Sequence, residues 1–170
     1  MGPVDEAEFR QFIAARLEPL RRTAYLLCRD WHTADDLVAI TIGKLVRHWR
    51  RVSRVENVDA YVRRVLLRVW LDERRRPWRR ESPTADLPEP RPVPGPDAGV
   101  VADRAALLDL LAQLPPQRRA VVVLRFYCDM SVQDTAEALG ISEGTVKSQA
   151  SRGLAALRLL AVDHNGVEGR

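Results

Sequence analysis

The chain is poor in cysteine, histidine and aromatic residues: its 170 residues include two Cys, three His and 6% Phe, Trp and Tyr. Cys28 and Cys128 are far apart in the sequence, and neither belongs to a CxxC pair. This pattern excludes a disulfide framework and a cysteine-based zinc site, and we expect both thiols to lie in the core. With so few aromatic residues, two small helical cores fit the composition better than one large core.

Other absences exclude broad classes of protein. No long apolar run without charges is present, and the N-terminal residues Met1–Glu6 are acidic rather than basic. We therefore expect no signal peptide, no membrane segment and a cytoplasmic location. The sequence also has no phosphate-binding glycine loop and no nucleophile elbow, so it predicts neither an enzyme nor a cofactor.

Histidines and carboxylates do not predict a metal site either. His32, Asp35, Asp36 and His48 are close in the sequence, but adjacent residues on a helix point in different directions. We expect no metal.

Prolines indicate the domain boundaries. Seven prolines lie between Pro77 and Pro96, together with glycines and acidic residues, and such a composition is typical of an extended linker. We expect an all-α protein with an N-terminal domain at 1–80, a linker at 81–101, a C-terminal domain at 102–163 and a tail at 164–170. Strand-like alternation is not sustained in any part of the sequence.

Charge is distributed unevenly between these parts. Residues 1–80 contain 18 Lys and Arg against 11 Asp and Glu, a net charge of +7, whereas residues 81–101 carry −3 and residues 102–170 are neutral. The N-terminal domain is therefore the main candidate for attracting a polyanion. A DNA-reading element in the C-terminal domain would depend on where individual charges lie.

The segment from Ser131 to Ser148 has the pattern of a DNA-binding helix-turn-helix. Val132 is expected to open the first helix, and the small Ala136 fits a close helix crossing. Gly140 suits the left-handed position that ends this helix, because it has no Cβ. Ser142 is predicted to cap the second helix, which begins at Glu143.

The second helix has one apolar side and one polar side. Val146, Ala150, Leu154 and Leu157 recur at helical spacing and are expected to pack inward. Lysine, arginine, serine, threonine and glutamine on the other sides can donate hydrogen bonds to phosphates and base edges in the major groove. The candidate DNA-reading residues are Ser142, Glu143, Thr145, Lys147, Ser148, Gln149, Ser151 and Arg152. The same pattern also fits an ordinary amphipathic hairpin with a solvated polar side.

Upstream, Pro115 and Pro116 are expected to end one helix and open the next. The apolar side of that next helix is predicted to consist of Val121, Leu124 and either Val122 or Phe126.

Three helical segments are expected in the N-terminal domain. The first spans Phe9–Leu27, with Pro19 breaking or kinking it, and the second starts at Thr33 and extends to Trp49. The third begins near Asn57 or Asp59 and ends at Arg76. It presents a basic side with a tryptophan, which suits phosphates and an unpaired base. This side carries Arg63, Arg64, Arg68, Trp70, Arg74 and Arg75. Alternatively, the basic helix is merely solvated and Trp70 plugs the domain surface.

The sequence also resembles a known family. Residues 114–131 read LPPQRRAVVVLRFYCDMS, similar to the LPPRQRAVLVLRYYEDLS pattern that precedes the helix-turn-helix of bacterial extracytoplasmic-function (ECF) sigma factors, and residues 140–148 continue the match with GISEGTVKS. In the N-terminal domain, Asp36-Leu37-Val38 and the segment Asp59–Val65 resemble the corresponding sigma domain. The resemblance is greatest to the actinobacterial SigE-like subgroup.

This resemblance implies a function in promoter recognition. The N-terminal domain would bind the β′ clamp helices of RNA polymerase core through Asp36, Leu37, Thr41 and Lys44, and the basic helix would bind the melted −10 element of promoter DNA. The C-terminal domain would bind the β flap and read the −35 element. Ala39 and Ile40 stand where the family usually has polar residues, which predicts fewer polar contacts to the clamp. An anti-sigma factor is a further candidate partner.

Two other functions fit a helix-turn-helix in principle. A polymerase-independent regulator would bind a palindromic operator as a dimer, and an adaptor would use its helices only to bind protein. A dimeric regulator needs a dimerisation surface or ligand pocket in its other half, whereas a sigma factor needs a basic, aromatic strand-binding helix. The sequence shows the second pattern, so we expect a sigma factor.

Overall fold

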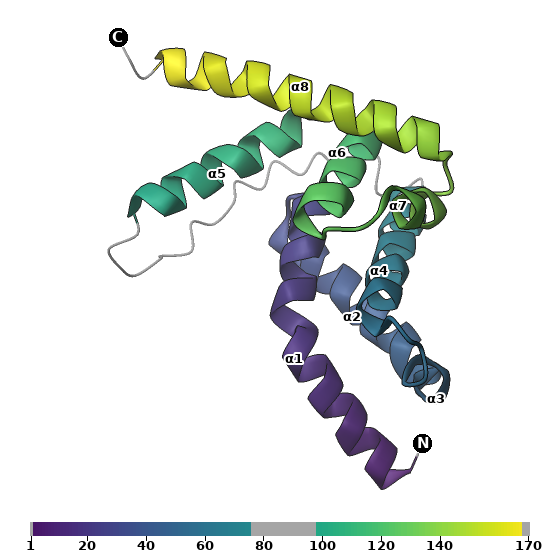
Figure 1. Cartoon of the computed structure of the whole chain (residues 1–170). Coiled ribbons are helices and arrows are strands. Elements are labelled where there is room, and N and C mark those ends of the chain that lie inside the picture. Colours follow the sequence, from purple (N-terminus) through teal and green to yellow (C-terminus); the bar gives the residue numbers. More distant parts are fainter. Residues whose placement is uncertain (1, 76–97, 168–170) are drawn as a thin grey trace. The chain divides into compact units, whose positions relative to one another are not determined.

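The computed structural model describes residues 2–75 and 98–167, and every regular element in these two ranges is a helix (Figure 1). The chain divides into two units, Met1–Asp86 and Leu87–Arg170. The predicted all-α class with two helical domains is confirmed. Within the described ranges, no helix is long and apolar enough to cross a membrane.

The N-terminal unit consists of α1 (Pro3–Cys28), α2 (Trp31–Arg47), the short α3 (Trp49–Val52) and α4 (Val58–Arg75). Helix α1 continues through Pro19, so the proline does not break the helix, and α1 is bent along its length (Figure 1). Trp49 does not extend α2 as predicted, because α2 ends at Arg47 and Trp49 begins α3.

A left-handed residue and an aspartate cap set the turn between α1 and α2. Arg29 has φ 61° and ends α1, and the Asp30 carboxylate accepts hydrogen bonds from the Thr33 amide at 2.8 Å and the Thr33 hydroxyl at 2.6 Å. The predicted start at Thr33 is therefore wrong, because Asp30 is the cap. Burial of the Asp30 carboxyl acts to raise its pKa, but the hydrogen bonds from Thr33 and the His32 amide, together with the electrostatic effect of His32, outweigh burial and hold the pKa below its usual value.

The start of α4 agrees with the sequence. The Asn57 side chain accepts a hydrogen bond from the Ala60 amide at 3.1 Å, which satisfies one of the free donors at the helix start. Helices α1, α2 and α4 pack against one another and bury an aliphatic core. The core side chains with at most 1% exposure are Ala24, Leu27, Ala34, Leu37, Leu45, Val52, Leu66, Leu67 and Val69.

The C-terminal unit contains α5 (Ala98–Gln113), α6 (Pro116–Val122), a π-helical turn η2 (Val123–Tyr127), α7 (Val132–Leu139) and α8 (Glu143–Val167). Pro116 is the first residue of α6, as predicted. The predicted linker at 81–101 overlaps the first residues of α5, which begins at Ala98. The remainder of that linker lies outside the described residues.

The π-helical turn changes which side chains face the core. The Cys128 amide donates to the Val123 carbonyl at 2.9 Å, the wide hydrogen-bond pattern of a π-helix. Val121 through Leu124 are all buried, whereas Phe126 is 49% and Tyr127 is 52% exposed. Of the two alternatives for the apolar side of this helix, Val122 is correct and Phe126 is not.

Candidate nucleic-acid interface

The helix-turn-helix is formed by α7 and α8, and its boundaries agree with the sequence. Helix α7 begins at Val132, with the Ser131 hydroxyl accepting from the Asp134 amide at 3.0 Å. Gly140 has φ 67° and ends α7. The amide of Ile141 then donates to the Ala136 carbonyl at 3.1 Å, a bond typical of helices that end in a left-handed residue.

Helix α8, the predicted recognition helix, starts with a serine cap. The Ser142 hydroxyl accepts from the Thr145 amide at 3.1 Å and lies 2.8 Å from the Thr145 hydroxyl. Glu143 is in the first turn, where its charge complements the helix dipole. The predicted cap at Ser142 and the predicted helix start at Glu143 are confirmed. Because Ser142 and Thr145 bond to each other, their side chains are held in fixed positions at the N-terminal end of α8.

The inner side of α8 is anchored in a small hydrophobic core. Val146 and Ala150 are buried together with Ala136 of α7 and Val121 of α6. Val132, Leu139 and Ile141 pack against this cluster. Gly153, further along the same side, is also buried. This packing fixes the direction of α8 relative to α6 and α7 and therefore decides which of its residues face outward.

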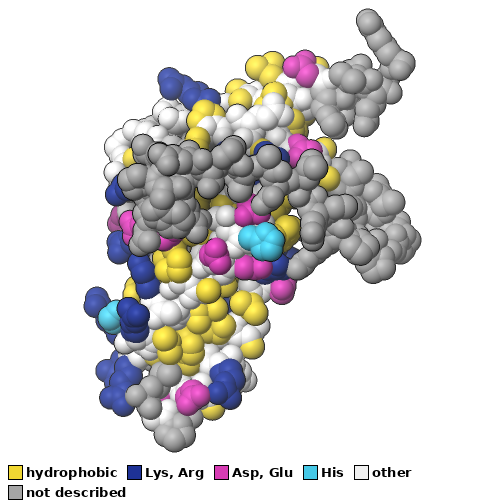
Figure 2. Space-filling model, turned by 180° about the vertical axis from the view of Figure 1, so that it is seen from behind, with side chains coloured by type: hydrophobic (Ala, Val, Ile, Leu, Met, Phe, Trp, Pro, Cys, Tyr) yellow, Lys and Arg dark blue, Asp and Glu magenta, His cyan; other side chains and the backbone are white. Residues whose placement is uncertain are grey.

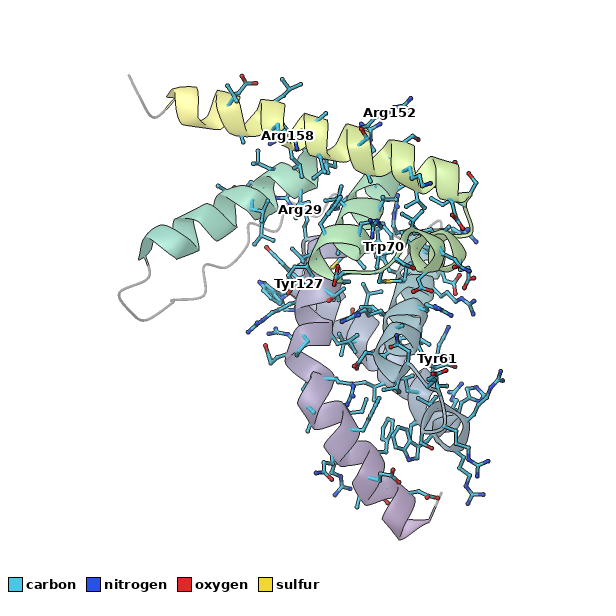
Figure 3. All side chains as sticks on the ribbon, viewed as in Figure 1. Arg29, Tyr61, Trp70, Tyr127, Arg152 and Arg158 are labelled. Carbon is cyan, nitrogen blue, oxygen red and sulfur yellow. The ribbon has the colours of Figure 1, made fainter. Side chains whose placement is uncertain are left out.

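The outer side of α8 carries most of the predicted DNA-reading residues. Figure 3 shows Arg152 pointing away from α6 and α7. Six of the predicted residues are exposed: Ser142, Glu143, Lys147, Ser148, Ser151 and Arg152. The hydroxyl and cationic groups of this surface, on Ser142, Lys147, Ser148, Ser151 and Arg152, can donate hydrogen bonds to DNA, whereas the Glu143 carboxylate can only accept them. Gly144 on the same side is exposed as well, so nothing bulky blocks approach to the first turn.

Gln149 differs from the other predicted DNA-reading residues. It is half-buried, and its Oε1 accepts a hydrogen bond from Arg118 Nε of α6 at 3.0 Å. Gln149 thus lies on the flank of α8 that faces α6, between the buried and exposed sides. The sequence period places it beside the polar residues, but the neighbouring helix determines what its side chain contacts.

In the N-terminal unit, the predicted −10 residues on α4 are placed unequally. Arg68, Arg74 and Arg75 are exposed, whereas Arg63 and Arg64 are half-buried. Trp70 is 3% exposed, and the Arg74 guanidinium lies 5.0 Å from the centre of its ring. The expectation that Trp70 offers a face to an unpaired base is therefore wrong for this conformation, and the alternative that it fills the domain surface is correct.

The predicted clamp-binding residues of α2 also separate into two groups. Asp36 and Lys44 are exposed. Leu37 and Thr41 are completely buried, and the Thr41 hydroxyl donates to the Leu37 carbonyl at 2.7 Å within the helix. Leu37 and Thr41 thus cannot touch a partner directly, because they face α1 and α4. Ile40 is 37% exposed between Asp36 and Lys44, so the outward side of α2 has an apolar residue at its centre.

Comparisons with known proteins identify the family of this chain. Residues 12–80 match the family model described as Sigma-70 region 2, and residues 104–157 match Sigma-70, region 4. The chain is 40% identical over 159 residues to the RNA polymerase sigma-E factor of Streptomyces coelicolor, covering 93% of this chain and 87% of the relative. This chain belongs to the ECF sigma factors, and it is SigE-like.

A further relative supports the same assignment of this sigma factor, and a solved structure has a similar fold. It is 33% identical to the ECF RNA polymerase sigma factor SigM of Mycobacterium tuberculosis over 174 residues, covering 98% of this chain and 84% of the relative. In fold it is similar to the sigma factor RpoE of Bartonella quintana, solved with the anti-sigma factor NepR, with a TM-score of 0.74 at 24% identity. That match covers 91% of this chain and 96% of the other.

Two features of this sigma factor were missed at the sequence level. One is Arg118, which the sequence predicted only to lie in the helix that precedes the helix-turn-helix. The other is a basic corner where α2 runs into α3, formed by the exposed residues Arg47, Arg50, Arg51 and Arg54. Figure 2 shows Lys and Arg side chains gathered along this edge of the N-terminal unit. The density of arginine around Trp49 is visible in the sequence and could have indicated this corner.

Proposed function

We propose that this sigma factor reads the −35 element with the outer side of α8. The observation that carries the proposal is that Val146 and Ala150 are fixed in the core while Lys147, Ser148 and Arg152 are exposed on the same helix. The major groove of DNA admits one α-helix, and a helix held by its inner side can enter it without rearrangement. The exposed Lys147 and Arg152 can donate to guanine edges or to phosphates.

The N-terminal unit would bind the melted −10 region and the polymerase core. Arg68 and Arg75 are exposed on α4, and the net charge of +7 in residues 1–80 favours a single strand of DNA. Asp36, Ile40 and Lys44 form the outward side of α2 and are proposed to contact the β′ clamp helices. Ile40 would add an apolar contact where the family usually has polar residues.

The biological setting follows from this role. The protein would act in the cytoplasm with RNA polymerase core, its C-terminal unit bound to the β flap. Solved relatives with a similar fold include RpoE bound to the anti-sigma factor NepR and CnrH bound to the cytosolic domain of CnrY. We propose that this chain is also held inactive by an anti-sigma protein. The family assignment does not favour a polymerase-independent dimeric regulator.

In vitro transcription with purified core on a random promoter library tests the proposal. Transcripts specific to certain promoters are expected only when this protein is added. Lys147→Ala and Arg152→Ala should each lower transcription from −35-dependent promoters, and loss of one good base contact corresponds to about 1–3 kcal/mol at one base position. Arg158→Ala is the matched control, because Arg158 is an exposed arginine further along α8.

Two results would contradict the assignment. Unchanged transcription across the whole library would exclude the sigma function. If Lys147→Ala and Arg152→Ala both still distinguished intact from mutated −35 elements as the wild type does, α8 would not be the helix that recognises the −35 element. For the N-terminal unit, replacing Arg68 and Arg75 by Ala should reduce the permanganate reactivity of thymines in the −10 region, and unaltered reactivity would mean that α4 is only a solvated basic surface.

A further inference from the structure

The contact between α6 and α8 includes a polar pair on the flank of the recognition helix. Arg118 of α6 donates its Nε–H to Gln149 Oε1 at 3.0 Å, and both side chains are half-buried. Within the described part of the chain, Gln149 is the one hydrogen-bonding partner of the Arg118 side chain. The two terminal nitrogens of the guanidinium therefore keep their N–H groups for another acceptor.

Gly153 determines the path of the Arg118 side chain along α8. A Cβ at position 153 would lie 3.3 Å from Arg118 Cγ and 3.8 Å from Arg118 Cδ. The aliphatic part of Arg118 thus passes over Gly153, and its guanidinium group reaches Gln149, one helical turn closer to the start of α8. The positive charge of Arg118, a residue of α6, therefore lies beside the N-terminal half of α8, which carries the predicted DNA-reading residues.

The surroundings of this guanidinium suit a phosphate. Lys147 and Arg152 are exposed on the same half of α8, so Arg118 extends a cationic surface sideways from the residues proposed to enter the groove. An arginine whose Nε is fixed presents its remaining N–H groups in a defined plane, the geometry in which guanidinium groups bind phosphate. The orientation of the Gln149 amide is also set, because an arginine N–H can bond only to its oxygen.

We propose that Arg118 binds a phosphate of the DNA backbone at the edge of the groove that α8 enters, and that Gln149 positions Arg118. This inference rests on the proposed reading of the −35 element by α8. It replaces the base-reading role that the sequence predicted for Gln149. A phosphate contact fixes the register of the recognition helix α8 on DNA and adds affinity for all sequences alike.

The test measures binding of the reconstituted holoenzyme to a promoter duplex recovered from the library, as a function of salt concentration. Loss of one phosphate contact lowers the slope of log affinity against log salt by about 0.9, or roughly a 3.5-fold difference between 50 and 200 mM salt. We expect this change for Arg118→Ala on duplexes with an intact and with a mutated −35 element. Arg118→Lys should restore the slope, because it keeps the charge.

Gln149 has a distinct expected signature as a positioning residue. Gln149→Ala should weaken binding on all sequences, and it should have no further effect when Arg118 is already alanine. Arg158→Ala is the matched control and should leave the slope unchanged. Thermal unfolding of each variant, followed by circular dichroism, identifies any loss of folded protein.

The outcomes separate this inference from the proposed function. If Lys147→Ala and Arg152→Ala impair −35-dependent binding but folded Arg118→Ala keeps the original salt slope, Arg118 is only a structural residue and the inference is wrong. If Gln149→Ala alters the preference for one base position, Gln149 is a reader and its positioning role is wrong. If none of these variants changes promoter binding, the proposed reading by α8 itself fails.

Discussion

Gly153 is a position where one added methyl group should destabilise the C-terminal unit. In a helix interior, Gly→Ala normally stabilises by roughly 0.5–1 kcal/mol. Here a Cβ would lie 2.5 Å from Val122 Cγ2, and Val122 is buried, so α6 and α8 would have to move apart. Such overpacking costs about 1–3 kcal/mol. Subtracting the propensity gain leaves a net loss of roughly 0–2.5 kcal/mol, and we expect Gly153→Ala to lie in the middle of this range, at about 1–2 kcal/mol.

Gly43 provides the matched control for this substitution. It lies within α2, and apart from its chain neighbours and the nearby backbone of its own helix no atom lies within 4 Å of a Cβ built there, so Gly43→Ala should stabilise the N-terminal unit by about 0.4–1 kcal/mol. The two glycines are both helical and differ in what surrounds them. The sign of the effect therefore depends on packing and not on helix propensity.

Thermal unfolding can report on each unit separately. All four tryptophans lie in the first 80 residues, so tryptophan fluorescence follows the N-terminal unit, while far-ultraviolet circular dichroism follows both units. Gly153→Ala should lower the dichroism transition of the C-terminal unit by roughly 4–16 °C and leave the fluorescence transition unchanged. A Val122→Ala substitution should relieve part of this effect. If Gly153→Ala raised the transition as Gly43→Ala does, the close α6–α8 crossing would be incorrect.

Two further substitutions test the helix ends. Gly140→Ala should destabilise the helix-turn-helix by about 1–2 kcal/mol, because an L-residue at φ 67° is strained. A smaller loss for Gly140→Asn would support this reason. Equal stability of the wild type and both variants in urea would exclude it. Asp30→Ala should lose roughly 0.5–2 kcal/mol at pH 7 through loss of the α2 cap. Because the pKa of Asp30 is lowered in the folded state, its stabilising contribution is fully present above the ordinary value of 3.8 and is lost as the pH falls through the folded pKa. The difference in unfolding free energy between wild type and Asp30→Ala should hence shrink below about pH 4, and a difference that grew on acidification would contradict the assignment.

The helix-turn-helix could be predicted from the sequence almost to the residue. Its determinants act over a few positions: Gly140 permits a left-handed turn, Ser142 caps the next helix, and Val146 and Ala150 share one side at helical spacing. Each of these requirements concerns residue types at fixed offsets, so no knowledge of distant contacts was needed.

Helical periodicity was insufficient where a helix is surrounded on several sides. Leu37 and Thr41 were predicted to face a partner, but α1 and α4 cover them. Trp70 was predicted to stack on a base, but it is buried beneath Arg74. A period shows which residues share a side of a helix, and only the packing of the other helices shows which sides remain free.

The sequence by itself determined the helical class, the two-domain organisation and the local geometry of the helix-turn-helix, because short-range capping and turn preferences specify them. The tertiary structure decided which polar residues are available to DNA and which belong to helix contacts. Gln149 bonds to Arg118, and Gly153 is required by the crossing of α6 over α8, because residues from segments 31 or more positions apart meet there. Such pairings depend on how whole helices pack, which no local pattern encodes.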